Sequence, residues 1–211
     1  MMMNRKSFIV GIKSTKLLNR EKKFLKKYKP WGVILFSRNI KSINQTKNLT
    51  DQIRKIFRDS KYPILIDQEG GRVNRLSNLL DASTFTAEFF GKLFKNDKKK
   101  FFIYSKIFIK QTCYLLEKIG ININTVPVLD VRRKNSNNII GDRSFSSNPI
   151  IVSKIGNFYL DILHKYKIAS VIKHIPGHGL AKVDSHKSTP IVKNLYKQLN
   201  KVDFYPFKKK K

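Results

Sequence analysis

Residues 171–186 read VIKHIPGHGLAKVDSH, an apolar run that turns into a polar segment broken by Pro176, Gly177 and Gly179. A short, continuous apolar run with a turn behind it is typical of a strand buried on both faces of a parallel sheet. In parallel α/β folds, ligands bind at the carboxyl ends of the strands. This stretch therefore predicts both the fold class and the place of a site.

Other short apolar runs precede this one and have the same continuous character. The predicted strands cover residues 7–12, 32–36, 63–67, 121–131 and 169–174. Because their apolar residues do not alternate with polar ones, we expect a parallel sheet that helices cover.

Helical patterns lie between these runs. Ser42 is the predicted cap of one helix, and a second helix is predicted over residues 101–119 with Gly120 as its left-handed stop. A third is indicated by an apolar stripe within residues 155–166. We expect the aromatic side chains of these helices in the core. The order of elements predicts an α/β fold in a single domain, residues 1–211.

Charged side chains lie at or beyond the carboxyl ends of three predicted strands: Asp67 and Arg75 at the third, Arg143 beyond the fourth, and Lys173 and His174 at the fifth. A carboxylate at a strand end can bind two neighbouring hydroxyl groups, and arginines can reinforce them with paired donors. An alternative is that Asp67 and Arg75 form a salt bridge that only braces their loop. The site hypothesis rests on all three strand ends.

Three of the four histidines lie within residues 171–186. Asp184 and His186 are two residues apart, so they share a face only if the chain is extended there. A carboxylate in contact with an imidazole orients the ring and raises its basicity, as a general acid/base requires. The alternative is a metal site made by His174, His178 and His186. Their i, i+4, i+12 spacing matches no zinc pattern, so we expect no metal.

The chain is strongly basic: Lys and Arg outnumber Asp and Glu by 44 to 14, a formal net charge of +30. Such an excess can indicate a nucleic acid, an anionic membrane or an acidic protein as partner. Here it is mostly lysine and accompanies many Asn, Ile and Phe residues, the bias of an A/T-rich genome. The lysine clusters at 98–100 and 208–211 also lack interleaved aromatic residues. We expect no dedicated nucleic-acid partner, and keep nucleic-acid binding as the lesser alternative.

The remaining composition indicates a globular protein, with 41% hydrophobic and 11% aromatic residues. Cys113 is the only cysteine, so no intramolecular disulfide forms, as suits a reducing cytoplasm. The apolar run before Lys13 is too short for a signal peptide or a membrane span. We expect a soluble cytoplasmic protein without a membrane partner.

Several of these segments together resemble a known family. The segments IDQEGGRVNRL (66–76), VPVLDV (126–131), GDRSF (141–145) and KHIPGHG (173–179) with a later DSH (184–186) are similar in order and separation to those of the glycoside hydrolase family 3 β-N-acetylhexosaminidases. The resemblance covers essentially the whole chain. It implies a (β/α)8 TIM barrel, of which about five of the eight βα units are present.

The resemblance also implies roles. The residues that would hold N-acetylglucosamine are Asp67, Arg75, Arg143, Lys173 and His174. His186, oriented by Asp184, would be the acid/base of a retaining mechanism that removes terminal β-linked N-acetylglucosamine from cell-wall muropeptides. No cofactor and no metal are implied.

The departure from the family concerns the nucleophile, an aspartate that follows a sixth strand in family members. No aspartate after His186 matches it, because Asp203 in DFYPF resembles the aspartate of the family's D-L-x-P-F helix. We therefore expect a chain truncated before its nucleophile. It could be an inactive sugar-binding remnant, or a fragment of a gene frameshifted at an adenine-rich tract encoding residues 208–211. A downstream polypeptide that completes the barrel is a candidate partner.

Overall fold

The computed structural model describes residues 5–133, 138–181, 183 and 188–208. The centre of the molecule is a parallel sheet in which each strand pairs with the next strand along the chain. In order across the sheet, the strands are β1 (Lys6–Gly11), β2 (Pro30–Leu35), β3 (Ile64–Ile66), β4 (Ile123–Asn124) and β5 (Ala169–Ser170). Parallel neighbours in sequence order are the arrangement of a (β/α)8 barrel.

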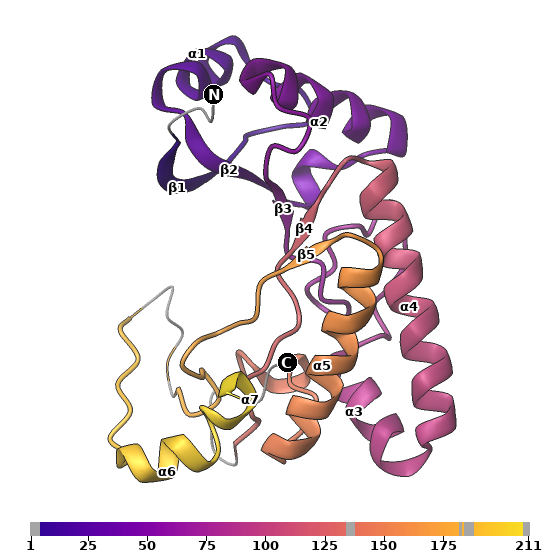
Figure 1. Cartoon of the computed structure of the whole chain (residues 1–211), viewed down its shortest axis with the longest axis vertical. Coiled ribbons are helices and arrows are strands. Elements are labelled where there is room, and N and C mark those ends of the chain that lie inside the picture. Colours follow the sequence, from indigo (N-terminus) through magenta and orange to yellow (C-terminus); the bar gives the residue numbers. More distant parts are fainter. Residues whose placement is uncertain (1–4, 134–137, 182, 184–187, 209–211) are drawn as a thin grey trace.

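Helices follow the strands and cover one side of the curved sheet (Figure 1). They are α1 (Asn19–Tyr28), α2 (Ile43–Phe57), α3 (Ala87–Asn96), α4 (Lys98–Lys118), α5 (Pro149–Lys165), α6 (Tyr196–Lys201) and α7 (Tyr205–Lys208), with 3-10 turns η1 (Ser37–Asn39) and η2 (Gly141–Arg143). Helices α4 and α5 pack side by side, and α7 packs against α5. This order confirms the predicted α/β fold, with five parallel strands within the described residues against the eight of a complete barrel.

The structure confirms the predicted parallel sheet but not every predicted strand boundary. The run 121–131 forms a strand only at β4, and the rest of it was wrongly assigned. Pro127 has no N–H group to donate to a ladder, so the chain leaves the sheet as a buried loop. An isolated parallel β-bridge between Val128 and Lys173 continues the pairing of β4 with β5 beyond the two strands. The run 169–174 is likewise shortened to β5.

The three predicted helices correspond to α2, α4 and α5. Ser42 caps α2 as predicted, because its hydroxyl accepts a hydrogen bond from the backbone N–H of Gln45 at 3.2 Å. Gly120 ends α4 in the left-handed region at φ +73°. Helix α4 begins earlier than predicted because Asp97 caps it, accepting from the N–H of Lys100 at 3.0 Å. The helix assignments are therefore confirmed, with one earlier start.

The sequence analysis missed α1 and α3. Helix α1 is rich in lysine, its cap residue Leu18 offers no side-chain acceptor, and only Leu25 is buried. Helix α3 is capped by the hydroxyl of Thr86, which accepts from the N–H of Phe89 at 3.0 Å. Helix α1 owes its place to the fold more than to a local pattern, whereas the Thr86 cap of α3 was a local signal that the sequence analysis did not use.

Aromatic rings join the helices into the core, as predicted. Phe90 of α3 lies 5.4 Å from Phe108 of α4 and 6.2 Å from Tyr159 of α5, measured between ring centroids. Burial raises the pKa of Tyr159 far above its ordinary value. These contacts fix α3 against the helices that follow β3 and β4.

Some apolar side chains on or next to the strands are exposed, although most apolar strand residues belong to the core. Ile9 of β1 and Trp31 of β2 are 44% and 42% exposed, and Val171 beyond β5 is 41% exposed. Among the described residues, β1 and β5 each pair with one strand only. None of the described helices combines the length and the apolar character needed to cross a membrane.

Candidate functional site

The carboxyl ends of β3, β4 and β5 surround a pocket of about 400 Å³. Its lining consists of Asp67, Glu69, Val73, Arg75, Ile139, Ile140, Arg143, Lys173, His174 and His178. The structure thus brings together all five residues that the sequence analysis selected as ligand contacts. It does so at the edge of the sheet where parallel α/β folds bind ligands.

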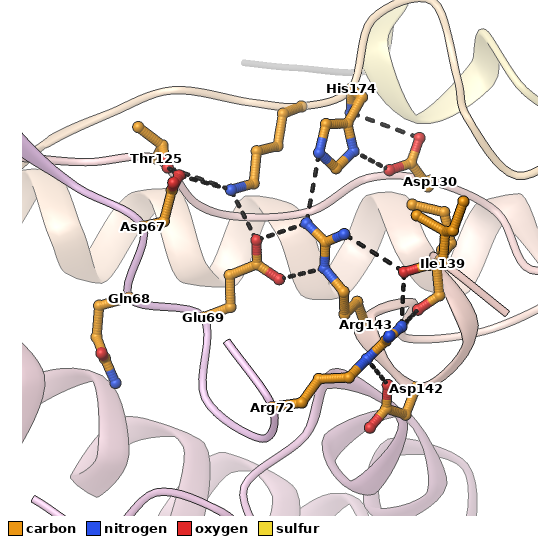
Figure 2. Close-up of polar contacts among 12 residues, drawn as sticks. Asp67, Gln68, Glu69, Arg72, Thr125, Asp130, Ile139, Asp142, Arg143 and His174 are labelled. Carbon is orange, nitrogen blue, oxygen red and sulfur yellow. Dashed lines mark hydrogen bonds and ion pairs between the residues drawn. The ribbon is translucent and has the colours of Figure 1, made fainter. Parts of the chain in front are cut away.

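Asp67 directly follows β3 and is held by two neighbours (Figure 2). The Nζ of Lys173 lies 3.0 Å from its Oδ1, and the hydroxyl of Thr125 donates to the same oxygen. Burial raises the pKa of the Asp67 carboxyl, but the nearby Lys173 charge, both hydrogen bonds and the charge of Arg75 outweigh burial and lower it. Asp67 is therefore a carboxylate with accepting capacity left for a ligand hydroxyl.

Glu69 is the buried carboxylate on which two cations of the pocket converge. Its side chain is 7% exposed. The guanidinium of Arg143 grips it with a pair of bonds of 2.7 and 2.8 Å, and Lys173 Nζ lies 2.7 Å from Oε1 (Figure 2). Although burial alone raises the pKa of Glu69, these partners lower it, and Glu69 in turn raises the pKa of Arg143 against burial. Arg143 and Lys173 are thus fixed in direction before any ligand binds.

His174 stands between a carboxylate and a guanidinium. Its Nδ1 lies 2.5 Å from Oδ2 of Asp130, and its Nε2 lies 3.4 Å from Nη2 of Arg143 (Figure 2). Asp130 Oδ1 also accepts the backbone N–H of His178 at 2.6 Å. The loop after β5 is therefore attached to the buried segment after β4.

Arg75 reaches the pocket without forming the loop-bracing salt bridge considered as an alternative. Asp67 pairs with Lys173 instead, and the Arg75 guanidinium lies 5.6 Å from the centroid of the Phe36 ring. The side-chain Nε of Arg75 is buried and has no hydrogen-bond partner among the described residues. Arg75 therefore retains donor capacity at the pocket wall.

Sequence reasoning missed three polar residues that organise the pocket: Glu69, Thr125 and Asp130. Glu69 is two residues beyond Asp67, a spacing that puts both on one side of an extended chain, and that signal was available. The signal for Asp130 was a carboxylate inside a buried apolar run, which requires a partner. Thr125 carries no comparable sequence signal.

The predicted acid/base pair, Asp184 and His186, lies outside the described residues. His186 is also one of the three histidines of the alternative metal site. The ring centroids of the other two, His174 and His178, are 6.0 Å apart. Within the described ranges, no group of three or more His, Cys, Asp or Glu side chains is arranged to hold a metal ion.

Asp203 was predicted within a helix, and this was wrong. It lies in the turn between α6 and α7, where the chain leaves the helical path. Its carboxylate is buried and lies 2.5 Å from Nη2 of Arg133. Asp203 thus ties the end of α6 to the loop that follows β4.

Carboxylates and cations gathered at the carboxyl ends of parallel barrel strands are the arrangement of an α/β-barrel enzyme. The family model described as glycosyl hydrolase family 3 N terminal domain matches residues 4–210. The chain belongs to glycosyl hydrolase family 3.

Relatives and solved structures agree with this assignment. The chain is 34% identical over 202 residues to a beta-hexosaminidase of Hydrogenovibrio crunogenus, covering 95% of this chain and 56% of the relative. It is 34% identical to beta-hexosaminidase A of Pseudoalteromonas piscicida, covering 87% of this chain and 31% of the relative. NagZ from Neisseria gonorrhoeae in complex with N-trifluoroacetyl-D-glucosamine superposes with a TM-score of 0.87 at 30% identity, covering 96% of this chain and 59% of that structure. The chain thus spans 56% and 31% of the lengths of these two relatives.

Proposed function

We propose that this chain forms the sugar-binding part of a β-N-acetylhexosaminidase, and that its pocket binds terminal β-linked N-acetylglucosamine. The observation that carries the proposal is the single pocket shared by Asp67, Arg75, Arg143, Lys173 and His174. The relatives called beta-hexosaminidases and the NagZ complex with an N-acylated glucosamine support the same ligand class.

The pocket offers the groups that a neutral sugar requires. The Asp67 carboxylate can accept from two neighbouring hydroxyls, and Arg75 supplies donors beside it. The ammonium of Lys173 is directed at Asp67, Thr125 and Glu69 and so orients the carboxylates. Glu69 offsets the charges of Arg143 and Lys173 through its ion pairs. The lining holds three cations and two carboxylates, so its net charge is small, which favours a hydroxyl-rich neutral ligand over a strongly charged one.

The reaction proposed for the complete enzyme is hydrolysis with retention. His186, oriented by Asp184, would protonate the leaving oxygen while a carboxylate nucleophile attacks the anomeric carbon, and would then deprotonate water to release the sugar. From the resemblance, the nucleophile is expected on a segment that these 211 residues do not carry. We therefore propose that this chain binds saccharides derived from cell-wall muropeptides but does not hydrolyse them. We propose the cytoplasm as the place where it does so.

Isothermal titration calorimetry with N-acetylglucosamine tests the proposal. The 211-residue chain should release or absorb heat on binding, and Asp67→Ala and Arg143→Ala should each abolish the signal. Asp51→Ala is a matched control, because that carboxylate lies on α2 in an exposed pair with Lys47. Binding heat that survives both pocket substitutions would place the ligand elsewhere.

A chromogenic N-acetylglucosaminide assay separates a sugar-binding remnant from an active hydrolase. We expect no turnover by the purified chain, with turnover restored only when a polypeptide carrying the remaining barrel strands is added. Turnover by the chain alone, lost in His186→Ala, would require a nucleophile within the present sequence.

A further inference from the structure

Asp130 is a completely buried carboxylate behind His174, and the sugar-binding proposal gives it no role. Its Oδ1 accepts the backbone N–H of His178 at 2.6 Å and that of His174 at 3.4 Å. Its Oδ2 lies 2.5 Å from Nδ1 of the His174 ring. Both oxygens are thus committed to the loop after β5.

These contacts restrict the protonation of the His174 ring. An ionised carboxylate only accepts hydrogen bonds, so the hydrogen between Asp130 and the ring must be on Nδ1. On the opposite side of the ring, Nε2 faces Arg143 Nη2 at 3.4 Å, and a guanidinium only donates. Both neighbours therefore favour the same tautomer, with hydrogen on Nδ1 and a lone pair on Nε2.

We propose that Asp130 is a positioning residue that holds His174 as the Nδ1–H tautomer and so keeps Nε2 an acceptor, whose lone pair a sugar hydroxyl takes over from the long 3.4 Å contact with Arg143 when the ligand binds. The proposal rests on the proposed function for the nature of the ligand. The His174 side chain is 38% exposed and lines the pocket, so Nε2 is within reach of a ligand. Without Asp130 the ring would be free to present a donor there, among the donors of Arg143 and Lys173.

The substitution Asp130→Asn should change which tautomer of His174 is favoured, while the side chain at position 130 keeps nearly the same shape. If the amide oxygen keeps the two backbone N–H groups, the amide nitrogen donates toward Nδ1 of His174. The hydrogen of the ring then moves to Nε2. Asp142→Asn is the matched control, because Asp142 pairs with Arg72 at 2.9 Å in the neighbouring loop and has no contact with the ring.

The test combines two measurements on the 211-residue chain. Long-range proton–nitrogen NMR of His174 at about pH 8, above the ordinary histidine pKa of ~6.5, identifies the protonated ring nitrogen. We expect hydrogen on Nδ1 in the unsubstituted chain and in Asp142→Asn, and on Nε2 in Asp130→Asn. Calorimetry should show N-acetylglucosamine affinity reduced roughly tenfold or more in Asp130→Asn, as expected for one lost hydrogen bond and one opposed donor.

The outcomes separate this inference from the proposed function. Hydrogen on Nε2 in the unsubstituted chain would overturn the inference, and that measurement needs no variant to fold. An Asp130→Asn chain with unchanged tautomer and unchanged affinity would overturn it as well. If the tautomers behave as expected but the unsubstituted chain binds no N-acetylglucosamine, the positioning role stands and the proposed function fails.

Discussion

At the scale of single residues, the pocket depends on one carboxylate that was not predicted to belong to it. Glu69 is 7% exposed and pairs with Arg143 and Lys173, the cations that the sequence analysis had selected as ligand contacts. Those cations keep their orientation because Glu69 is ionised and buried beside them. The residue types at the site were predictable from sequence, whereas their pairing was not, because Glu69 and Arg143 are far apart along the chain.

Removing this carboxylate should be costly. We expect Glu69→Ala to lower the free energy of unfolding by about 3–5 kcal/mol, because the largely buried Arg143 loses its carboxylate partner and Lys173 keeps only Asp67. Asp51→Ala, which breaks an exposed pair with Lys47, should cost about 0–1 kcal/mol. Urea denaturation of both variants provides the comparison. Equal losses would show that Glu69 contributes no more than a surface charge.

The same carboxylates predict how stability depends on pH. The pKa values of Asp67 and Glu69 are lower in the folded chain than in the unfolded chain, so the unfolded state binds more protons between the two values. The stabilisation is complete above the unfolded pKa values of about 4 and is lost as pH falls through the folded ones. We expect the free energy of unfolding to decline below about pH 5.

A double variant separates the contribution of Asp67 and Glu69 to the pH dependence of stability from that of the other carboxylates. Asp67→Asn with Glu69→Gln should show a shallower decline between about pH 5 and pH 2, because neither residue can then bind a proton. Chemical denaturation at a series of pH values measures the slope. An unchanged slope would mean that these two groups titrate alike in the folded and unfolded chain.

At the scale of secondary-structure elements, helix α3 positions the loop that carries Arg143. A Cβ atom added at Gly91 of α3 would lie 1.6 Å from the backbone oxygen of Phe145, which follows η2. Glycine therefore lets the helix approach the backbone directly. The rigid contact holds the chain two residues beyond Arg143.

Gly91→Ala tests this contact. In an exposed helix the change would stabilise by up to about 1 kcal/mol. Here it should destabilise by more than ~1 kcal/mol and weaken N-acetylglucosamine binding, because the loop that carries Arg143 must move. Lys92→Ala, at an exposed neighbouring position, serves as the control. A stabilised Gly91→Ala chain with unchanged affinity would show that the contact is easily relaxed.

The elements differ in how far sequence predicts them. Helices α2, α4 and α5 were predictable because a cap, a terminal glycine or an apolar stripe marks each one locally. Helix α1 lacks such marks, and the loop after β4 is as apolar as a strand because it is buried. Burial there comes from packing against the rest of the chain, which a local pattern does not encode.

At the scale of the whole molecule, the chain presents an incomplete barrel. It covers 59% of the N. gonorrhoeae NagZ structure at a TM-score of 0.87. The exposed apolar residues Ile9 and Trp31 lie on β1 and β2. Strand β1 is at the edge of the described sheet and pairs there with β2 alone. We expect a polypeptide that supplies the remaining strands to cover this surface and to bring the nucleophile, and the nucleophile is the reason we expect it to restore turnover.

The net charge of +30 is a second whole-molecule feature. If it reflects genome composition, binding to duplex DNA should be non-specific and should weaken steeply as salt is raised toward physiological concentration. Fluorescence anisotropy at a series of salt concentrations measures this. Tight, sequence-dependent binding at about 0.15 M salt would favour the nucleic-acid alternative.

The central claim is that the pocket after β3, β4 and β5 binds N-acetylglucosamine. A crystal structure of the 211-residue chain with this sugar tests it most directly. We predict the sugar ring inside the pocket, with neighbouring hydroxyls on the Asp67 carboxylate and a further hydroxyl donating to Nε2 of His174. A sugar bound elsewhere, or in the pocket without contact to Asp67, would contradict the assignment.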